Sequence, residues 1–170
     1  MQEYRIADPM TLREAFIGSI GREGMLICAA ASDGAPNPMT ATWGGVGFMW
    51  GRPVFWCAVR QCRYTYTLLE TQDAVSLSFY GEAGRAALAY CGTHSGRDTN
   101  KVRGAGLTPM RDGDFFFFEG ARLVLEGRKL YADTLRPEGF CDARIPSDSY
   151  SQGEYHKLYF CEVQKVLVAR

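Results

Sequence analysis

Two arginines, Arg60 and Arg63, stand three residues apart at the point where a buried strand is expected to pass into a helix. Their guanidinium groups, the Thr65 hydroxyl and the free N–H groups of the first helical turn would converge there. Arginine binds phosphate through paired N–H donors, and the dipole of a helix favours an anion at its N-terminus. The spacing therefore indicates a phosphate site. The alternative is a solvated turn in which Thr65 caps the helix.

A second polar segment is unusual for an ordinary strand. It reads Asn37-Pro38-Met39-Thr40-Ala41-Thr42-Trp43. A strand here would place one amide and two hydroxyls beside Met39 and Trp43, and buried polar groups need hydrogen-bond partners. A planar ligand with heteroatoms along its rim would supply those partners. The alternative is a half-exposed strand whose threonines face water.

Two further groups of polar residues each have two interpretations. Residues 93–101 are rich in hydrogen-bond donors, but Ser95-x-x-Asp98 also matches a capping box that would open the next helix. By itself this match favours a helix cap over a binding site. His156 follows Tyr155 at the start of the last expected strand. It would serve there as a proton donor near a reducible ring, or as a structural side chain.

Several common catalytic and metal-binding patterns are missing from the sequence. The glycine cluster at residues 44–51 departs from the dinucleotide-binding fingerprint by one position, and no helical pattern follows it. The chain has no Walker A loop, no His-Glu-x-x-His and no Gly-x-Ser-x-Gly. Its six cysteines include no Cys-x-x-Cys pair, and with two histidines no zinc spacing can be written. We therefore expect no metal site, and cysteines that are mostly small buried hydrophobic residues.

The composition limits the classes of partner. A length of 170 residues fits one domain, residues 1–170, and 46% hydrophobic with 22% charged residues is typical of a folded globular protein. With 19 basic and 19 acidic residues, the chain lacks the positive field that nucleic-acid binding requires. The N-terminus has no apolar targeting segment, and prolines interrupt the longest uncharged stretch. These features predict a cytoplasmic protein that does not enter a membrane.

The elements that would position these polar groups are mostly strands. Alternating and β-branched patterns predict six strands, over residues 25–31, 38–43, 53–59, 74–80, 121–133 and 155–168. Helical spacing predicts a lead-in helix over 10–17, within a helical segment 1–23, and short helices over 64–71, 85–90 and 98–103. Asp33-Gly34 between the first two strands is typical of a hairpin turn. Few helices and no strand–helix–strand alternation favour an antiparallel barrel.

Five motifs, taken in order, resemble the flavin reductase-like, FMN-binding split-barrel family, and more closely its flavoredoxin-type branch. They are Met39-Thr40-Ala41-Thr42-Trp43-Gly44, Arg60-x-x-Arg63-Tyr64-Thr65-Tyr66, Cys91-Gly92-Thr93-x-Ser95-Gly96-Arg97-Asp98-x-x-Lys101, Ala121-Arg122-Leu123-Val124-Leu125-Glu126 and Tyr155-His156-x-Leu158-Tyr159. Each motif alone is weak, but the five in this order are specific. The resemblance extends over residues 24–168.

The resemblance implies a mainly β fold, a six-stranded antiparallel split β-barrel with a few short helices, and a homodimer that holds FMN near the subunit interface. It also implies the cofactor contacts, which are Asn37, Met39, Thr40, Ala41, Thr42 and Trp43 along the isoalloxazine, Arg60, Arg63, Tyr64 and Thr65 at the phosphate, and Ser95, Gly96 and Lys101 closing over the cofactor. His156 matches a histidine that lies near the reductant in some flavin reductases, which favours a catalytic role.

Two positions depart from the family pattern. Cys161 stands where the family usually has glycine, and Gly127 stands where the branch often has cysteine. A side chain at Cys161 would narrow the space behind its strand. The resemblance therefore does not determine the shape of the pocket on the nicotinamide side.

The implied activity is that of an oxidoreductase that passes electrons from NADH or NADPH through flavin to an acceptor. One alternative is a flavoredoxin-type electron carrier that is reduced by an electron-transfer protein. The other is a non-catalytic module that binds flavin or another planar molecule. Haem is disfavoured, because two histidines offer few axial ligands.

Overall fold

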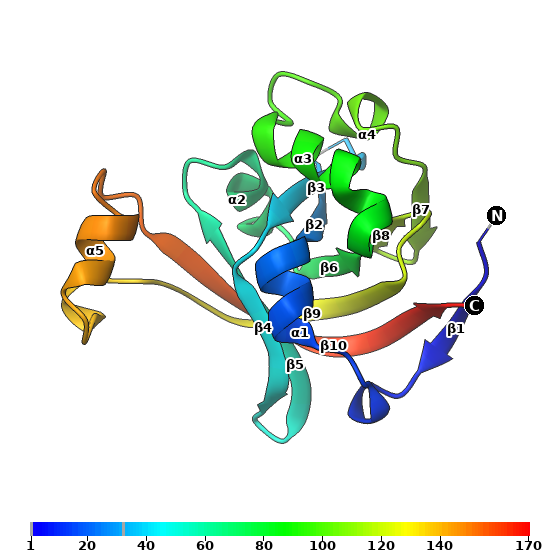
Figure 1. The fold of residues 1–170 in the computed structure, drawn as a ribbon, viewed down its shortest axis with the longest axis horizontal. Coiled ribbons are helices and arrows are strands. Elements are labelled where there is room, and N and C mark those ends of the chain that lie inside the picture. Colours follow the sequence, from blue (N-terminus) through cyan, green and yellow to red (C-terminus); the bar gives the residue numbers. More distant parts are fainter. Residues whose placement is uncertain (1, 32) are drawn as a thin grey trace.

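The fold is a curled antiparallel sheet with short helices around it (Figure 1). The computed structural model describes residues 2–31 and 33–170. An 8-stranded sheet has the order β3-β2-β6-β9-β10-β5-β4, with β1 paired to β10, and β7 and β8 form a separate pair. The strands are β1 Tyr4–Ala7, β2 Met25–Ala30, β3 Pro36–Ala41, β4 Gly44–Met49, β5 Arg52–Arg60, β6 Ala74–Phe79, β7 Pro109–Asp112, β8 Phe115–Phe118, β9 Leu123–Thr134 and β10 His156–Ala169.

The helices are short and lie between the strands. They are α1 Phe16–Gly18, α2 Tyr64–Leu69, α3 Arg85–Thr93, α4 Lys101–Gly104 and α5 Arg144–Ser149, with single turns of 3-10 helix at Pro9–Thr11, Gly81–Gly84 and Pro137–Gly139 and a π-helical turn at Ser19–Glu23. Figure 1 shows α5 on a long excursion between β9 and β10 that projects from the barrel. No helix in the described part of the chain is long and apolar enough to cross a bilayer.

The connection between β3 and β4 closes the sheet. These strands stand at opposite ends of the strand order, yet only Thr42 and Trp43 separate them in the sequence. Two residues span only a few ångströms, so the sheet must curl until its edges meet. The N–H of Ala58 on β5 donates to the Trp43 carbonyl at 3.2 Å and ties the seam together.

Side chains alternate between the two faces of the sheet. On β5 and β10 the residues Phe55, Cys57, Tyr159 and Cys161 point into the main core and are fully buried. Their neighbours in sequence point outward. A second core cluster lies on the other face, where β8 and α3 cover Leu26, Cys28 and Val124 with side chains that include Phe117, Phe118, Leu88 and Cys91.

The six expected strands and the antiparallel, mainly β class are confirmed. The strand count is wrong, because β1, β4, β7 and β8 are additional. β4 is glycine-rich for a steric reason: a Cβ on Gly44 would lie 2.7 Å from the Trp56 carbonyl, and one on Gly45 would lie 2.4 Å from Trp56 Nε1. Close packing against Trp56 therefore requires glycines in this strand, and because glycine has a low strand propensity, the sequence pattern does not predict β4.

The expected lead-in helix over residues 10–17 is interrupted: the structure has separate short turns at Pro9–Thr11, Phe16–Gly18 and Ser19–Glu23, so the segment is not helical throughout. Residues 4–7 form β1, which pairs with the end of β10. Asp8 then caps a single 3-10 turn, where its carboxylate accepts the Met10 N–H at 2.9 Å. Pairing with a free edge of β10 satisfies the backbone of residues 4–7, which a helix would otherwise have to satisfy internally.

The expected helix over residues 98–103 is shorter than predicted, and its cap is different. α4 begins at Lys101, and the Asn100 side chain accepts the Arg103 N–H at 3.0 Å. Ser95 instead accepts the Arg97 N–H at 3.2 Å within a turn. The predicted capping box is therefore wrong, and residues 95–99 form a loop beside α2 and β3.

Candidate functional site

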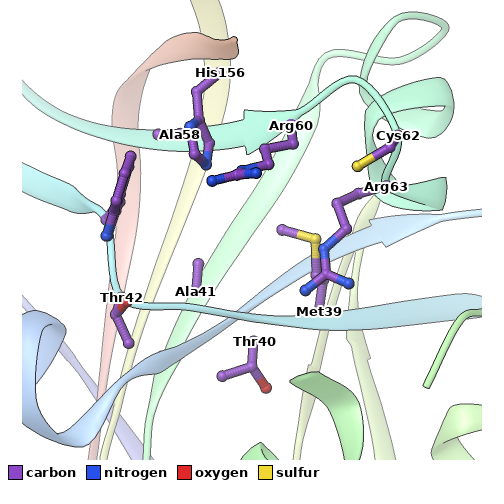
Figure 2. Close-up of a pocket in the computed structure, with 10 residues that line it drawn as sticks. Met39, Thr40, Ala41, Thr42, Ala58, Arg60, Cys62, Arg63 and His156 are labelled. Atoms are coloured by element: carbon purple, nitrogen blue, oxygen red, sulfur yellow. The ribbon is translucent and has the colours of Figure 1, made fainter. Parts of the chain in front are cut away.

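A cavity of about 390 Å³ opens at the seam between β3, β5 and β10 (Figure 2). It is lined by Met39, Thr40, Ala41, Thr42, Trp43, Ala58, Arg60, Cys62, Arg63 and His156. Figure 2 shows Arg60, Arg63 and His156 pointing into the space above β3. The curl of the sheet explains this arrangement, because it brings the end of β3 opposite the end of β5.

A second cavity of about 230 Å³ adjoins the first, and the two share Met39, Cys62 and Arg63. Its other lining residues are Tyr64, Thr65, Cys91, His94, Ser95, Gly96, Arg97, Asp98 and Lys101. Every predicted site residue except Asn37 lines one of these two cavities. Asn37 lines a third cavity, of about 530 Å³, together with Tyr64, Gly96 and Lys101.

The cationic side chains around the shared wall bind carbonyl oxygens and no carboxylates. The guanidinium group of Arg60 donates to the Ser149 carbonyl at 2.9 Å. Arg63 donates to the Gly92 carbonyl at 3.2 Å, and Arg97 donates to the Cys62 carbonyl at 3.0 Å. Within residues 2–31 and 33–170, no acidic side chain forms an ion pair with any of the three. These three guanidinium groups therefore have no ion-pair partner within the described residues, and the Asp98 side chain lines the second cavity without pairing with them.

Lys101 adds a buried ammonium group to the second cavity. Its Nζ donates to the Cys91 carbonyl at 3.0 Å. Burial lowers the pKa of Lys101 from its ordinary value, and the nearby Arg63 charge lowers it further. The negative charge of an anion bound between these cations would stabilise the charged ammonium and so oppose this lowering of the pKa, which favours a negatively charged ligand.

Asn37, Thr65 and Gly96 pack together at the base of α2. The Asn37 amide donates to the buried Thr65 hydroxyl at 2.9 Å, and a Cβ on Gly96 would lie 2.1 Å from Asn37 Oδ1. Glycine is therefore required at position 96. The cap position of α2 is Arg63, which makes no side-chain cap bond. Thr65 lies inside the helix, so the alternative that made it a solvated cap is wrong.

The polar and apolar side chains of β3 and of Thr42, which follows it, lie in different environments. Thr40 donates its hydroxyl to the Leu88 carbonyl of α3 at 2.6 Å. Met39 is buried and belongs to the main core, whereas Thr42 is exposed at the rim. The structure thus already satisfies the Thr40 hydroxyl, and it leaves Thr42 and the backbone to face the cavity.

His156 lies against Trp43 and Tyr150. Its ring centroid is 4.4 Å from that of Trp43, and its Nδ1 is 2.9 Å from the Tyr150 hydroxyl. Burial lowers the pKa of His156 to about 4, and the charges of Arg60 and Arg63 act in the same direction. The ring is therefore neutral near physiological pH. A neutral ring can donate a hydrogen bond from its one N–H group, and the catalytic role of His156 stays a prediction.

The two departures from the family pattern lie away from the cavity. Cys161 is fully buried in the main core, on the face of β10 opposite to His156. The anticipated narrowing of the pocket by Cys161 is therefore wrong. A Cβ on Gly127 would lie 2.5 Å from the Phe55 ring and 2.6 Å from the Glu162 carbonyl. Phe55 occupies the space that a side chain at position 127 would need.

Several residues that line the cavities are not among those predicted from the sequence. Ala58 and Cys62 flank the predicted Arg60, and their place in the wall follows from the alternation of β5 and the turn after it. Arg97 lies 5.5 Å over the Tyr64 ring, within the motif that the resemblance covered. Tyr150 gave no signal, because its contact with His156 depends on how the excursion folds back.

Comparison with known proteins identifies the fold. A family model described as "Flavin reductase like domain" matches residues 18–170. The chain belongs to the flavin reductase-like domain family. Its solved neighbours include FMN-binding, flavin reductase-like proteins, so the split-barrel class predicted from the sequence is confirmed. No curated protein matches the chain.

Three solved structures illustrate how this flavin reductase-like domain compares with its neighbours. Flavoredoxin of Desulfovibrio vulgaris (Miyazaki F) is 20% identical with a TM-score of 0.68, covering 85% of this chain and 68% of that chain. An FMN-binding domain of a flavin reductases-like enzyme from Shewanella baltica OS155 is 15% identical with a TM-score of 0.68, covering 98% and 78%. Nitrilotriacetate monooxygenase component B from Bacillus cereus is 14% identical with a TM-score of 0.69, covering 100% and 84%. At these identities the likeness shows the fold alone.

The residues of this flavin reductase-like domain fit FMN. Lys101 and arginines that form no ion pair within the described residues suit a phosphate, and Gly96 lets the backbone approach closely where a side chain would clash. The first cavity combines the apolar Met39, Ala41 and Ala58 with backbone groups of β3, which suits a planar ring with a polar rim. Among the described residues no group of His, Cys, Asp and Glu side chains is arranged to hold a metal ion.

Proposed function

We propose that this flavin reductase-like domain is an FMN-dependent oxidoreductase that passes electrons from NADH or NADPH through the flavin to an acceptor. The observation that carries the proposal is the pair of adjoining cavities, around whose shared wall the arginines form no ion pair within the described residues. One cavity has the apolar floor that an isoalloxazine needs, and the other has the cations that a phosphate needs. FMN carries both groups in one molecule.

The residues divide the work of binding by chemistry. Arg60, Arg63, Tyr64 and Thr65 would hold the phosphate, with Ser95, Gly96 and Lys101 closing over the cofactor. Asn37 supports Thr65, and Met39, Thr40, Ala41, Thr42 and Trp43 would border the isoalloxazine. The flavin supplies hydride-acceptor chemistry when bound, and the chain supplies placement and electrostatic stabilisation of the reduced ring.

His156 would contact the reductant. Its neutral ring lies at the end of the cavity opposite the second cavity, beside Trp43. An N–H donor there would orient a bound nicotinamide without transferring a proton, because hydride transfer between two rings depends on alignment.

The test begins with the absorption spectrum of the purified protein and identification of any released cofactor. Flavin-loaded protein is then mixed anaerobically with NADH and with NADPH, and we expect rapid bleaching of the flavin by at least one of them. A flavin that stays oxidised with both, yet accepts electrons from ferredoxin, would identify a flavoredoxin-type carrier instead. A flavin that no donor reduces would leave only a binding module.

We also propose a homodimer that closes over this site. The outward face of β5 and β10 carries Trp56 and Phe160 in register, and the Phe160 ring contacts those of Trp56, Tyr131 and Trp50 at centroid distances of about 6 Å. Trp50 is 52% exposed and Tyr131 49%. An exposed aromatic face of this kind is typical of an interface.

The aromatic face is continuous with the cavity, which favours a second copy of the chain as its occupant. The paired positions along β5 and β10 run from Trp56 and Phe160 through Ala58 and Leu158 to Arg60 and His156, all on one face. A protein seated on the rings would therefore also cover the mouth of the cavity. A permanent subunit suits a site that must shield a reduced ring from water.

A reducing compartment suits the cysteines. All six are free thiols, and Cys28, Cys57, Cys91 and Cys161 are buried. We therefore keep the cytoplasm as the proposed location.

A further inference from the structure

The excursion between β9 and β10 returns one side chain to the cavity. Tyr150 follows α5 and lies against the first residue of β10, where its hydroxyl is 2.9 Å from His156 Nδ1. Tyr150 is 5% exposed and His156 is 9% exposed. A hydrogen bond this well shielded from water fixes both partners more firmly than a surface contact would.

The chemistry of the two groups sets the direction of this hydrogen bond. A neutral imidazole nitrogen with a free lone pair is a far stronger base than a phenol oxygen, so the phenol is the donor. Arg60 reinforces this polarity, because its guanidinium carbon lies 5.7 Å from the centre of the Tyr150 ring. With Nδ1 as the acceptor, the proton of a neutral imidazole resides on Nε2.

Nε2 of His156 is available to a ligand. Among residues 2–31 and 33–170 it has no hydrogen-bond partner, and it is not sealed in the core. His156 lines the first cavity, and Figure 2 shows its ring beside Arg60 over the cavity floor. The free N–H is therefore accessible from the cavity.

We infer that Tyr150 is a positioning residue: its hydroxyl holds His156 as the Nε2–H tautomer, which presents a neutral N–H donor to a carbonyl or carboxamide oxygen in the cavity. The tautomer follows from this chain alone, whereas the identity of the acceptor as a nicotinamide carboxamide rests on the proposed function. No covalent or proton-transfer step is involved.

Three further contacts hold the pair in place. Trp43 packs on one side of the imidazole, and Tyr155 stacks on Tyr150 with ring centroids 4.6 Å apart. Arg60 bonds the Ser149 carbonyl, next to Tyr150. The ionisable and charged groups that face His156 are thus Tyr150, Arg60 and Arg63, and both charges are positive. The positive charges of Arg60 and Arg63 therefore both disfavour a second proton on the imidazole ring.

The test measures the tautomer directly, by ¹⁵N NMR of the histidine ring nitrogens in flavin-loaded protein. The His156 signals are those lost in His156→Gln. We expect an unprotonated Nδ1 and a protonated Nε2. In Tyr150→Phe we expect the ring nitrogens to shift toward a mixture of tautomers. Tyr155→Phe is the matched control, because it removes a phenol hydroxyl from the same cluster that makes no hydrogen bond within the described residues.

Steady-state kinetics of the two variants distinguish a positioning role of the Tyr150 hydroxyl from a packing role of the aromatic cluster. Losing one neutral hydrogen bond weakens binding roughly 3- to 10-fold. In Tyr150→Phe we therefore expect the KM for NADH or NADPH to rise by this factor, with kcat less affected. Tyr155→Phe should leave both values near wild type, and FMN affinity should change in neither variant.

Each outcome tests a separate claim: the tautomer, the positioning role or the proposed function. A wild-type Nδ1 that carries the proton, or ring signals unchanged in Tyr150→Phe, overturns the tautomer assignment, and the wild-type spectrum alone suffices if the variant does not fold. A shifted tautomer with an unchanged KM overturns the positioning role. A wild-type flavin that neither nicotinamide reduces overturns the proposed function, while the tautomer result still stands.

Discussion

Arg63 is the cationic residue that lines both cavities, and it forms no ion pair with a carboxylate within the described residues. Charge-assisted hydrogen bonds to phosphate are worth more than neutral ones. We therefore expect Arg63→Ala to weaken FMN binding at least ~10-fold while riboflavin, which lacks the phosphate, binds almost as before. Fluorescence titration of the flavin-free protein measures both affinities.

Arg85→Ala is the matched control for this prediction. Arg85 lies on the surface of α3, paired with Glu82, and lines neither cavity. Its loss should change neither affinity. An equal loss of FMN and riboflavin affinity in Arg63→Ala would refute a phosphate contact.

Glu126 is a buried carboxylic acid with a testable pH signature. Both of its oxygens are buried and have no hydrogen-bond partner among the described residues. Burial raises the pKa of Glu126 to about 7, with a smaller contribution from the Asp112 charge. Because the folded pKa lies above the unfolded value, the native state binds the proton more tightly, and stability is lost as pH rises from about 4.5 to about 7.

Replacing Glu126 with glutamine should remove that dependence. The free energy of unfolding of Glu126→Gln, relative to wild type, should be higher at about pH 8 than at about pH 5. Denaturant unfolding at both pH values measures it, with the exposed Glu138→Gln as control. The same difference at both pH values would show that Glu126 titrates normally.

At the scale of elements, β5, β9 and β10 are locked together around Gly127. The Phe55 ring of β5 lies where a side chain at position 127 would be, and the Glu162 carbonyl of β10 blocks the same space. Gly127→Ala should therefore destabilise the fold by about 1–3 kcal/mol through overpacking. Chemical denaturation measures the change.

Gly47→Ala on β4 is the comparison that isolates this steric effect. Nothing lies within 4 Å of a Cβ at Gly47, and its backbone is that of an ordinary strand. We expect no loss of stability there, and no loss of flavin affinity because Gly47 lines neither of the two site cavities. Equal destabilisation at both glycines would mean that strand propensity, not Phe55, sets the requirement.

At the scale of the whole molecule, the aromatic face decides whether the site is complete in one copy. Trp50→Asp combined with Tyr131→Asp would place two charges on this face. We expect wild type to sediment as a dimer and the double variant as a monomer with weaker FMN binding, since charges are poorly tolerated in an interface core. Analytical ultracentrifugation measures the mass.

Ile17→Asp serves as the surface control for the dimer. Ile17 is 93% exposed on α1 and belongs to neither the aromatic face nor the cavities. It should remain a dimer. A wild-type protein that is monomeric at all concentrations would contradict the proposed assembly.

The sequence by itself determined six of the strands and the family, and it predicted the chemistry of the site. Alternation along residues 53–59 and 155–168 predicted the long strands, because burial of one face leaves a period of two. The spacing of Arg60 and Arg63 indicated an anion site, because a strand passing into a helix converges donors locally. Motif order then predicted the family that the comparison confirmed.

Only the tertiary structure decided which of these groups meet. Trp43 closes the barrel because β3 and β4 pair with strands at opposite ends of the sheet order, a relation that no local pattern encodes. Cys161 proved to face the core, because its register with Phe55 sets its direction. Tyr150 reaches His156 through the folding of a long excursion. Local propensity reports the period of a segment, whereas such contacts depend on pairing and loop closure between distant segments.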